Sequence, residues 1–179
     1  MYKKFLPLIQ FLPLSLFSSY GFWQNHMSNE RWLEAFQLAA LAGIIQLIFT
    51  YFQQKPINRL ILATNFYLIC GGLAAFFQQW WYLEIVQSLQ ESAIFIFMIL
   101  VGLITTLTNT SGYLAADNLA KNTHRYSSYI LLFATFFALF NANAFQGEIV
   151  RSAIIPIILL SLLHRYLVFR LINGQNNCD

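Results

Sequence analysis

The chain has 179 residues, of which 58% are hydrophobic and only 9% carry a charge. A soluble globular domain carries roughly a quarter charged residues, so this composition excludes an ordinary soluble protein and places most of the chain in a lipid bilayer. The formal net charge of +3 comes from basic residues scattered among short hydrophilic gaps. Membrane topology explains that distribution, and nucleic acid is therefore not an expected partner. The sequence predicts an all-α, polytopic membrane helical bundle that forms one domain over residues 1–179.

Six apolar segments are long enough to cross a bilayer, because a helix rises about 1.5 Å per residue and the hydrocarbon core is about 30 Å thick. We expect transmembrane helices at about 5–23, 33–52, 60–79, 92–108, 126–144 and 149–172. A cleaved signal peptide is the other interpretation of the first segment. Its length, Pro7, Pro13 and its end at Trp23 favour a retained span.

Two further segments carry local predictions. Residues 83–91 form an amphipathic stretch, which either lies along the membrane interface or begins the fourth span obliquely. Pro156 is expected to bend the sixth span, because proline cannot donate the helical hydrogen bond to Ser152.

The orientation follows from the positions of the cations. If there are six spans, the side that holds both termini carries eight of the ten Lys and Arg residues. These eight are Lys3, Lys4, Lys55, Arg59, Lys121, Arg125, Arg165 and Arg170. The other side carries only Arg31 and Arg151, together with all four tryptophans. Since positive residues concentrate on the cytoplasmic side, the sequence predicts that both termini are cytoplasmic.

Small residues in the second and third spans predict a helix-packing site. Gly71, Gly72 and Ala75 lie in the third span, and Ala39 and Gly43 are four residues apart in the second. In lipid, such residues let neighbouring helices approach closely. The two adjacent glycines face about 100° apart on a helix, so we expect them to serve two different neighbours. A Gly71→Ala substitution is expected to be mild, because alanine has the better helix propensity.

A possible polar intramembrane site comprises His164 and Arg165 in the sixth span and Asn65 in the third. Arg165 precedes Arg170 by five residues, about 7.5 Å along a helix, which is within the reach of an arginine stem. Snorkelling toward the interface is therefore the favoured role of Arg165, and lining a polar cavity is the other. Asn65 is expected to form an interhelical hydrogen bond, with a place along a substrate path as the alternative.

The sequence contains no signature of catalysis, and we predict no catalytic, cofactor-binding or metal-binding residues. The histidines His26, His124 and His164 are too dispersed for a metal site, and the chain has no glycine-rich phosphate loop. Cys70 and Cys178 are too far apart in the sequence to suggest a disulfide scaffold. No Asp or Glu lies firmly inside a predicted span, which argues against an ion-coupled transporter.

Two segments resemble the intracellular septation protein A family, small inner-membrane proteins of Gram-negative bacteria. The first is the FLPL string at 11–14, preceded by Lys4-Phe5 and followed by Phe17 and Tyr20. The second is GGLAAFF at 71–77, which is similar to the family's GGLxxFF stretch. Between the fourth and fifth spans the chain reads SGYLAAD at 111–117, where the family has a Lys-Pro-Leu-Ile type element.

The resemblance implies a non-enzymatic inner-membrane protein that supports cell-envelope maintenance and septation. Its expected partners are membrane lipids and division or elongation membrane proteins, and it implies no cofactor. The alternative is a small-solute transporter or permease subunit, which six spans with broken helices also suit. The interior of the bundle distinguishes the two functions, because a scaffold is packed with apolar side chains and a transporter encloses a water-filled polar cavity.

Overall fold

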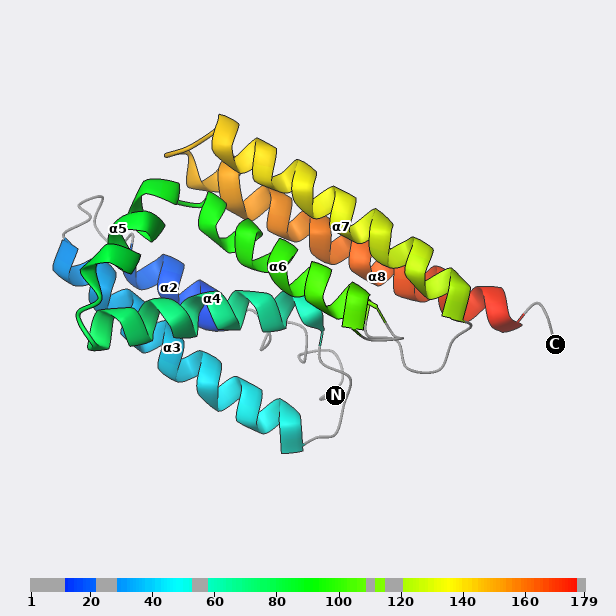
Figure 1. Ribbon diagram of the computed structural model, residues 1–179, viewed down its shortest axis with the longest axis horizontal. Coiled ribbons are helices and arrows are strands. Elements are labelled where there is room, and N and C mark those ends of the chain that lie inside the picture. The colour runs from blue at the N-terminus through cyan, green and yellow to red at the C-terminus, as the bar shows by residue number, and fades with distance from the viewer. Residues whose placement is uncertain (1–11, 22–28, 53–57, 109–111, 115–120, 177–179) are drawn as a thin grey trace. The chain divides into compact units, whose positions relative to one another are not determined.

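The computed structural model describes residues 12–21, 29–52, 58–108, 112–114 and 121–176 (Figure 1). Within these ranges the chain is helical apart from short turns and contains no β-strand. The prediction of an all-α protein is therefore confirmed for the described part of the chain.

Among the described residues, four stretches of helix are long and apolar enough to cross a membrane. They are α3 (Asn29–Phe52), α4 (Arg59–Phe76), α7 (Lys121–Ala144), and the π-helical turn η2 (Val150–Ile154) with α8 (Ile155–Asn176). The pair α5 (Trp80–Leu89) and α6 (Ser92–Thr108) makes a fifth if it is one broken span. The expected first span at 5–23 is described only in part, as α2 (Leu12–Gly21), so six spans stay a prediction.

Helix α4 ends at Phe76, three residues before the expected end of the third span. A left-handed turn stops it, because Gln78 has φ 54° and the Gln79 N–H donates to the Ala74 carbonyl at 2.8 Å. Glycine usually occupies this position in a helix C-terminal turn, since a side chain disfavours positive φ. A glutamine gives no such signal in the sequence, which is why the predicted span ran past the true end.

We expect Gln78→Gly to stabilise the protein by about 1 kcal/mol, because glycine removes the penalty of a left-handed residue with a Cβ. Thermal unfolding in detergent measures the change. Gln79→Gly is the matched control and should give no gain, since Gln79 is not among the positive-φ residues. A lower unfolding temperature for Gln78→Gly than for the parent would contradict the described turn.

The contacts within the chain define two compact units, which are described separately. Unit 1 comprises Met1–Lys55 and Ile61–Ser88, and unit 2 comprises Pro56–Leu60 and Leu89–Asp179. The predicted single domain over residues 1–179 stays a prediction.

The core of unit 1 is built around Phe36 of α3, which is completely buried. Its ring lies 4.6 Å from that of Phe17, 4.8 Å from that of Trp32 and 5.5 Å from that of Tyr67, measured between centroids. Aromatic pairs at these distances add to the stability that burial alone provides. The ring of Phe36 is therefore held between α2, its own helix and α4.

Unit 2 is formed by α6, α7 and α8, which run alongside one another (Figure 1). The π-helical turn η2 precedes Pro156, and in it the Ile155 N–H bonds to the Val150 carbonyl, five residues back. Proline would clash with the preceding turn of a regular α-helix, and a π-helical turn is a recognised local adjustment to such a misfit. The helix is thus irregular next to the position where the sequence predicts a bend.

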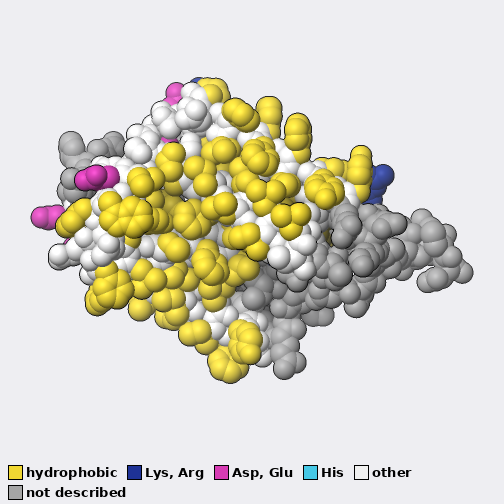
Figure 2. Space-filling model, viewed as in Figure 1, with side chains coloured by type: hydrophobic (Ala, Val, Ile, Leu, Met, Phe, Trp, Pro, Cys, Tyr) yellow, Lys and Arg dark blue, Asp and Glu magenta, His cyan; other side chains and the backbone are white. Residues whose placement is uncertain are grey.

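The surface agrees with a membrane environment. Figure 2 shows hydrophobic side chains over most of the visible face of the described residues. On α7, Phe133, Phe137 and Phe140 are each more than two-thirds exposed. A soluble monomer rarely exposes so much contiguous apolar surface, whereas lipid-facing helices do so throughout.

Candidate functional site

The most unusual local structure in unit 2 is the segment Gly112–Leu114, which follows α6 and precedes α7. The connection between these two helices is largely polar in sequence, yet Tyr113 and Leu114 are 0% and 2% exposed. Gly112 has φ 55°, a conformation that glycine adopts without strain. The segment is therefore part of the interior of unit 2.

Three side chains from three different helices hold three consecutive residues of this segment. Arg59, the first residue of α4, donates to the Gly112 carbonyl. Ser128 of α7 accepts a hydrogen bond from the Tyr113 N–H at 2.9 Å, and His164 of α8 donates to the Leu114 backbone. A buried backbone group without a partner costs free energy, so these side chains allow the segment to be buried. We call the segment and its three partners the clasp.

The ring of Tyr113 fills space that Gly102 leaves free on α6. A Cβ placed on Gly102 would lie 3.1 Å from the Tyr113 ring and 2.9 Å from Leu132 Cδ1. The Tyr113 hydroxyl lies near Thr135, whose own hydroxyl donates to the Leu131 carbonyl at 2.8 Å. Burial raises the pKa of Tyr113 well above its usual range, so the phenol stays neutral at physiological pH.

The three residues of the predicted polar intramembrane site belong to two different units, so the site itself stays a prediction. His164 is buried in the clasp, and its Nε2 atom has no hydrogen-bond partner among the described residues. Arg165, the next residue on α8, is exposed. Asn65 belongs to unit 1, where its side-chain amide donates to Gln46 Oε1 at 3.0 Å across α4 and α3. Asn65 therefore has the interhelical role that was expected for it.

Most of the clasp could not be predicted from the sequence, in which only His164 was a candidate site residue. Arg59 was counted as a cation that sets the topology, and Tyr113 lies in the largely polar connection between the fourth and fifth predicted spans. One signal was present, because the apolar string Tyr-Leu-Ala-Ala at 113–116 interrupts that polar connection. Ser128 and Gly102 carried no signal of their own, since their roles depend on where Tyr113 lies.

In unit 1 the glycine pair lies directly against α3. A Cβ placed on Gly71 would overlap the ring of Phe36. One placed on Gly72 would overlap the Ala40 Cβ and lie 2.9 Å from the Phe36 carbonyl oxygen. Thus the nearest atoms to both glycines belong to one helix, and the expectation that they serve two different neighbours is wrong. The third span can approach α3 this closely only because neither residue has a side chain.

The other three predicted packing residues also lie within unit 1. Ala39 is fully buried, and Ala75 is buried in a cluster with Ala74 and Leu83. Gly43 is less crowded, because the nearest atom to a Cβ placed there is Asn65 Oδ1 at 3.6 Å, an ordinary contact.

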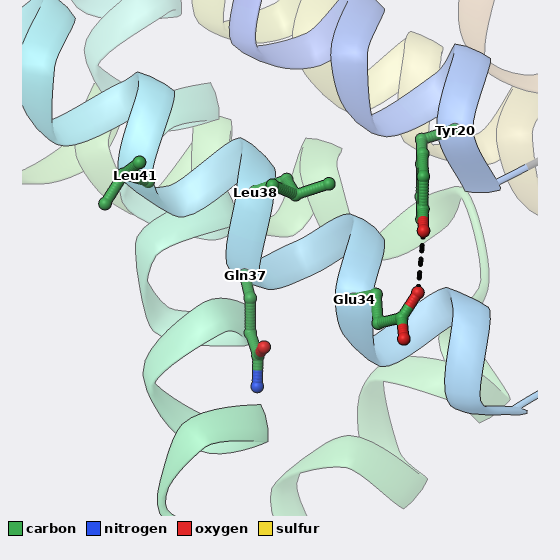
Figure 3. A pocket seen from close by; sticks show the side chains of 5 residues that line it. All are labelled: Tyr20, Glu34, Gln37, Leu38 and Leu41. Atoms are coloured by element: carbon green, nitrogen blue, oxygen red, sulfur yellow. Dashed lines mark hydrogen bonds between the residues drawn. The ribbon is translucent and has the colours of Figure 1, made fainter.

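Unit 1 also carries an open groove, drawn in Figure 3, which is lined by Tyr20, Glu34, Gln37, Leu38 and Leu41. The Tyr20 hydroxyl donates to Glu34 Oε2 at 2.7 Å across α2 and α3. Both side chains are exposed, and this bond links two helices at the surface. Within the described ranges, no three His, Cys, Asp or Glu side chains gather where they could hold a metal ion.

We expect Ser128→Ala to destabilise unit 2 by about 1–3 kcal/mol, because the buried Tyr113 N–H would lose its acceptor. Ser161→Ala is the matched control, since its hydroxyl donates to the Ile157 carbonyl of its own helix and leaves no orphaned group when removed. Chemical unfolding in detergent measures both variants. Equal stability of Ser128→Ala and Ser161→Ala would contradict the clasp.

Comparison of the chain with protein-family models, curated proteins and solved structures gave no match. The resemblance to the intracellular septation protein A family therefore stays a prediction from the residues quoted for it.

Proposed function

We propose that the protein is a non-enzymatic membrane scaffold, which acts through contacts with other membrane proteins. The observation that carries this proposal is the packing of Tyr113 in unit 2, where its ring lies against Gly102 and the clasp holds its backbone. The Tyr113 side chain is large and fully buried, and the backbone that carries it is held by hydrogen bonds. This arrangement supports a rigid, packed bundle.

The use of the buried polar side chains also favours a scaffold. Ser128, Arg59 and His164 hold the backbone of one segment, and Asn65 bonds to Gln46 between two helices. These are the ordinary structural roles of polar residues in membrane helices. One observation favours the alternative, a small-solute transporter or permease subunit, because the Nε2 atom of His164 is buried without a partner among the described residues. Buried ionisable groups of this kind mark polar pathways in some transporters.

The finer features of the proposal come from the sequence. They are a bacterial inner membrane, six spans with cytoplasmic termini, and a role in cell-envelope maintenance and septation with division or elongation proteins. The eight-to-two distribution of cations supports the orientation, and the FLPL and GGLAAFF segments support the process. Membrane lipids are the surrounding partner, and no cofactor is proposed.

Deletion of the gene in the native bacterium tests the proposed process. A scaffold for septation predicts elongated or misdivided cells, restored by the parent chain. Normal division and normal resistance to envelope stress in the deletion strain would contradict it. The transporter alternative is tested separately in reconstituted vesicles, where uptake driven by a pH gradient would reverse our ranking of the two functions.

A further inference from the structure

Helix α5 places two tryptophans on one exposed face immediately after a candidate membrane span. Helix α4 has 18 residues and is about 27 Å long at 1.5 Å per residue, so its full length is needed to cross the hydrocarbon core of a bilayer. The turn at Gln78 follows directly, and α5 begins at Trp80. The start of α5 therefore lies at the level where α4 leaves the hydrocarbon core.

The length of α5 decides how it can sit there. It has 10 residues and is about 15 Å long, which is half of what a span requires. One face is fixed to unit 1, because Leu83 is buried against Ala74 and Ala75, and Val86 is also buried. The helix therefore cannot turn that face to lipid without unpacking the end of α4.

The opposite face combines apolar and polar side chains in a way that suits one environment. Trp80, Trp81 and Ile85 are each at least half exposed, and Glu84 is exposed between them. A carboxylate facing the hydrocarbon core is costly, while exposed indoles in water leave a large apolar surface unburied. The headgroup region accommodates both, and tryptophan is enriched there because its ring is apolar and its N–H is polar.

The polar end of one indole already has a partner on the protein. The Trp81 Nε1–H donates to Gln79 Oε1 at 3.1 Å, in the turn that joins α4 to α5. This bond fixes the orientation of the Trp81 ring relative to the end of α4. The depth of the ring in the membrane therefore determines the depth of the end of α4.

From these observations we propose that α5 is an interfacial helix, whose Trp80, Trp81 and Ile85 face binds the headgroup–glycerol region of the lipid bilayer. The opposite face packs through Leu83 on Ala74 and Ala75 at the end of α4. The helix then sets the depth of α4 in the membrane. This proposal is independent of the scaffold function, since it depends only on unit 1 and lipid.

Depth-dependent fluorescence quenching tests this proposal. The full chain carrying Trp23→Phe and Trp32→Phe is reconstituted in phosphatidylcholine vesicles that contain a nitroxide on the headgroup, at acyl carbon 5 or at acyl carbon 16. We expect the headgroup or carbon-5 label to quench the remaining emission at least twofold more than the carbon-16 label. Strongest quenching by the carbon-16 label would place α5 inside a span and overturn the proposal. Absence of quenching at every depth would also overturn it.

A subtractive measurement removes the two tryptophans of α5 in place of the other two. In the chain that carries Trp23→Phe alone, Trp80→Phe with Trp81→Phe should lower the shallow quenching at least twofold, whereas Trp32→Phe should leave most of it, because Trp32 is half-buried against Phe36. Shallow quenching that is unchanged by the loss of both Trp80 and Trp81 would contradict the assignment.

Discussion

Replacing Gly72 with alanine is expected to destabilise unit 1 by about 1–3 kcal/mol, the usual scale of overpacking in a close-packed interior. The added methyl group would overlap the Cβ of Ala40 and crowd the Phe36 carbonyl. These atoms belong to the backbone and the first side-chain atom of α3, so they can move only if the whole helix moves. Helix propensity favours alanine by roughly 1 kcal/mol, which offsets part of the cost but does not reverse it.

Gly43→Ala is the matched control, because a methyl group there meets Asn65 at an ordinary contact distance. We expect it to be neutral or slightly stabilising. Thermal unfolding of both variants in the same detergent, followed by near-ultraviolet circular dichroism, gives the comparison. If Gly72→Ala unfolds at the same temperature as Gly43→Ala, the two helices do not approach as described.

Gly71→Ala should also be destabilising, contrary to the expectation from sequence. The added methyl group would overlap the ring of Phe36, and that ring is enclosed by Phe17, Trp32 and Tyr67. A flexible, exposed neighbour could turn aside at little cost, but a fully buried ring cannot. An unfolding temperature equal to that of Gly43→Ala would show that Phe36 has room to move.

Tyr113→Ala is expected to have the largest effect of any single truncation in unit 2, about 3–5 kcal/mol. The side chain is completely buried, so its removal leaves a cavity between α6 and α7 next to Gly102. Partial unfolding shows as faster proteolysis of the α6–α7 connection in detergent. Cleavage of Tyr113→Ala at the same rate as the parent would contradict the buried position of the ring.

Tyr113→Phe separates packing from hydrogen bonding at the same position. The Tyr113 hydroxyl is buried and makes no hydrogen bond of normal geometry with a described residue. Its removal should therefore be close to neutral, since no partner is left unpaired. Loss of more than about 1.5 kcal/mol in Tyr113→Phe would show that the hydroxyl has a partner worth a full hydrogen bond.

The sequence predicted the bounds of one apolar helix well, because composition alone decides them. The predicted fourth span coincides with α6, Ser92–Thr108, because Glu91 precedes it and a polar run follows it. The end of α4 was missed, since Gln78 adopts a conformation usually reserved for glycine. Local pattern could identify the apolar segment but not the turn that stops it.

The packing sites divide in the same way. Gly71 and Gly72 could be predicted as packing residues because glycine in the middle of a span usually marks a close helix contact. The helix that they contact could not be predicted from their own segment of the chain. The clasp was missed because Arg59, Tyr113, Ser128 and His164 are separated by up to 105 positions. Each of these residue types occurs often in membrane helices without such a role. Only the fold shows that the side chains of Arg59, Ser128 and His164 hold the backbone of the segment that contains Tyr113.

Photocrosslinking in living cells tests the scaffold function most directly. A photoreactive residue replaces, one at a time, the exposed Phe49, Phe133, Phe137 and Leu159, with the buried Leu131 as the control position. We predict that at least one exposed position forms adducts with division or elongation membrane proteins, and that Leu131 forms none. Adducts with lipid alone at every exposed position would contradict a function through contacts with other membrane proteins.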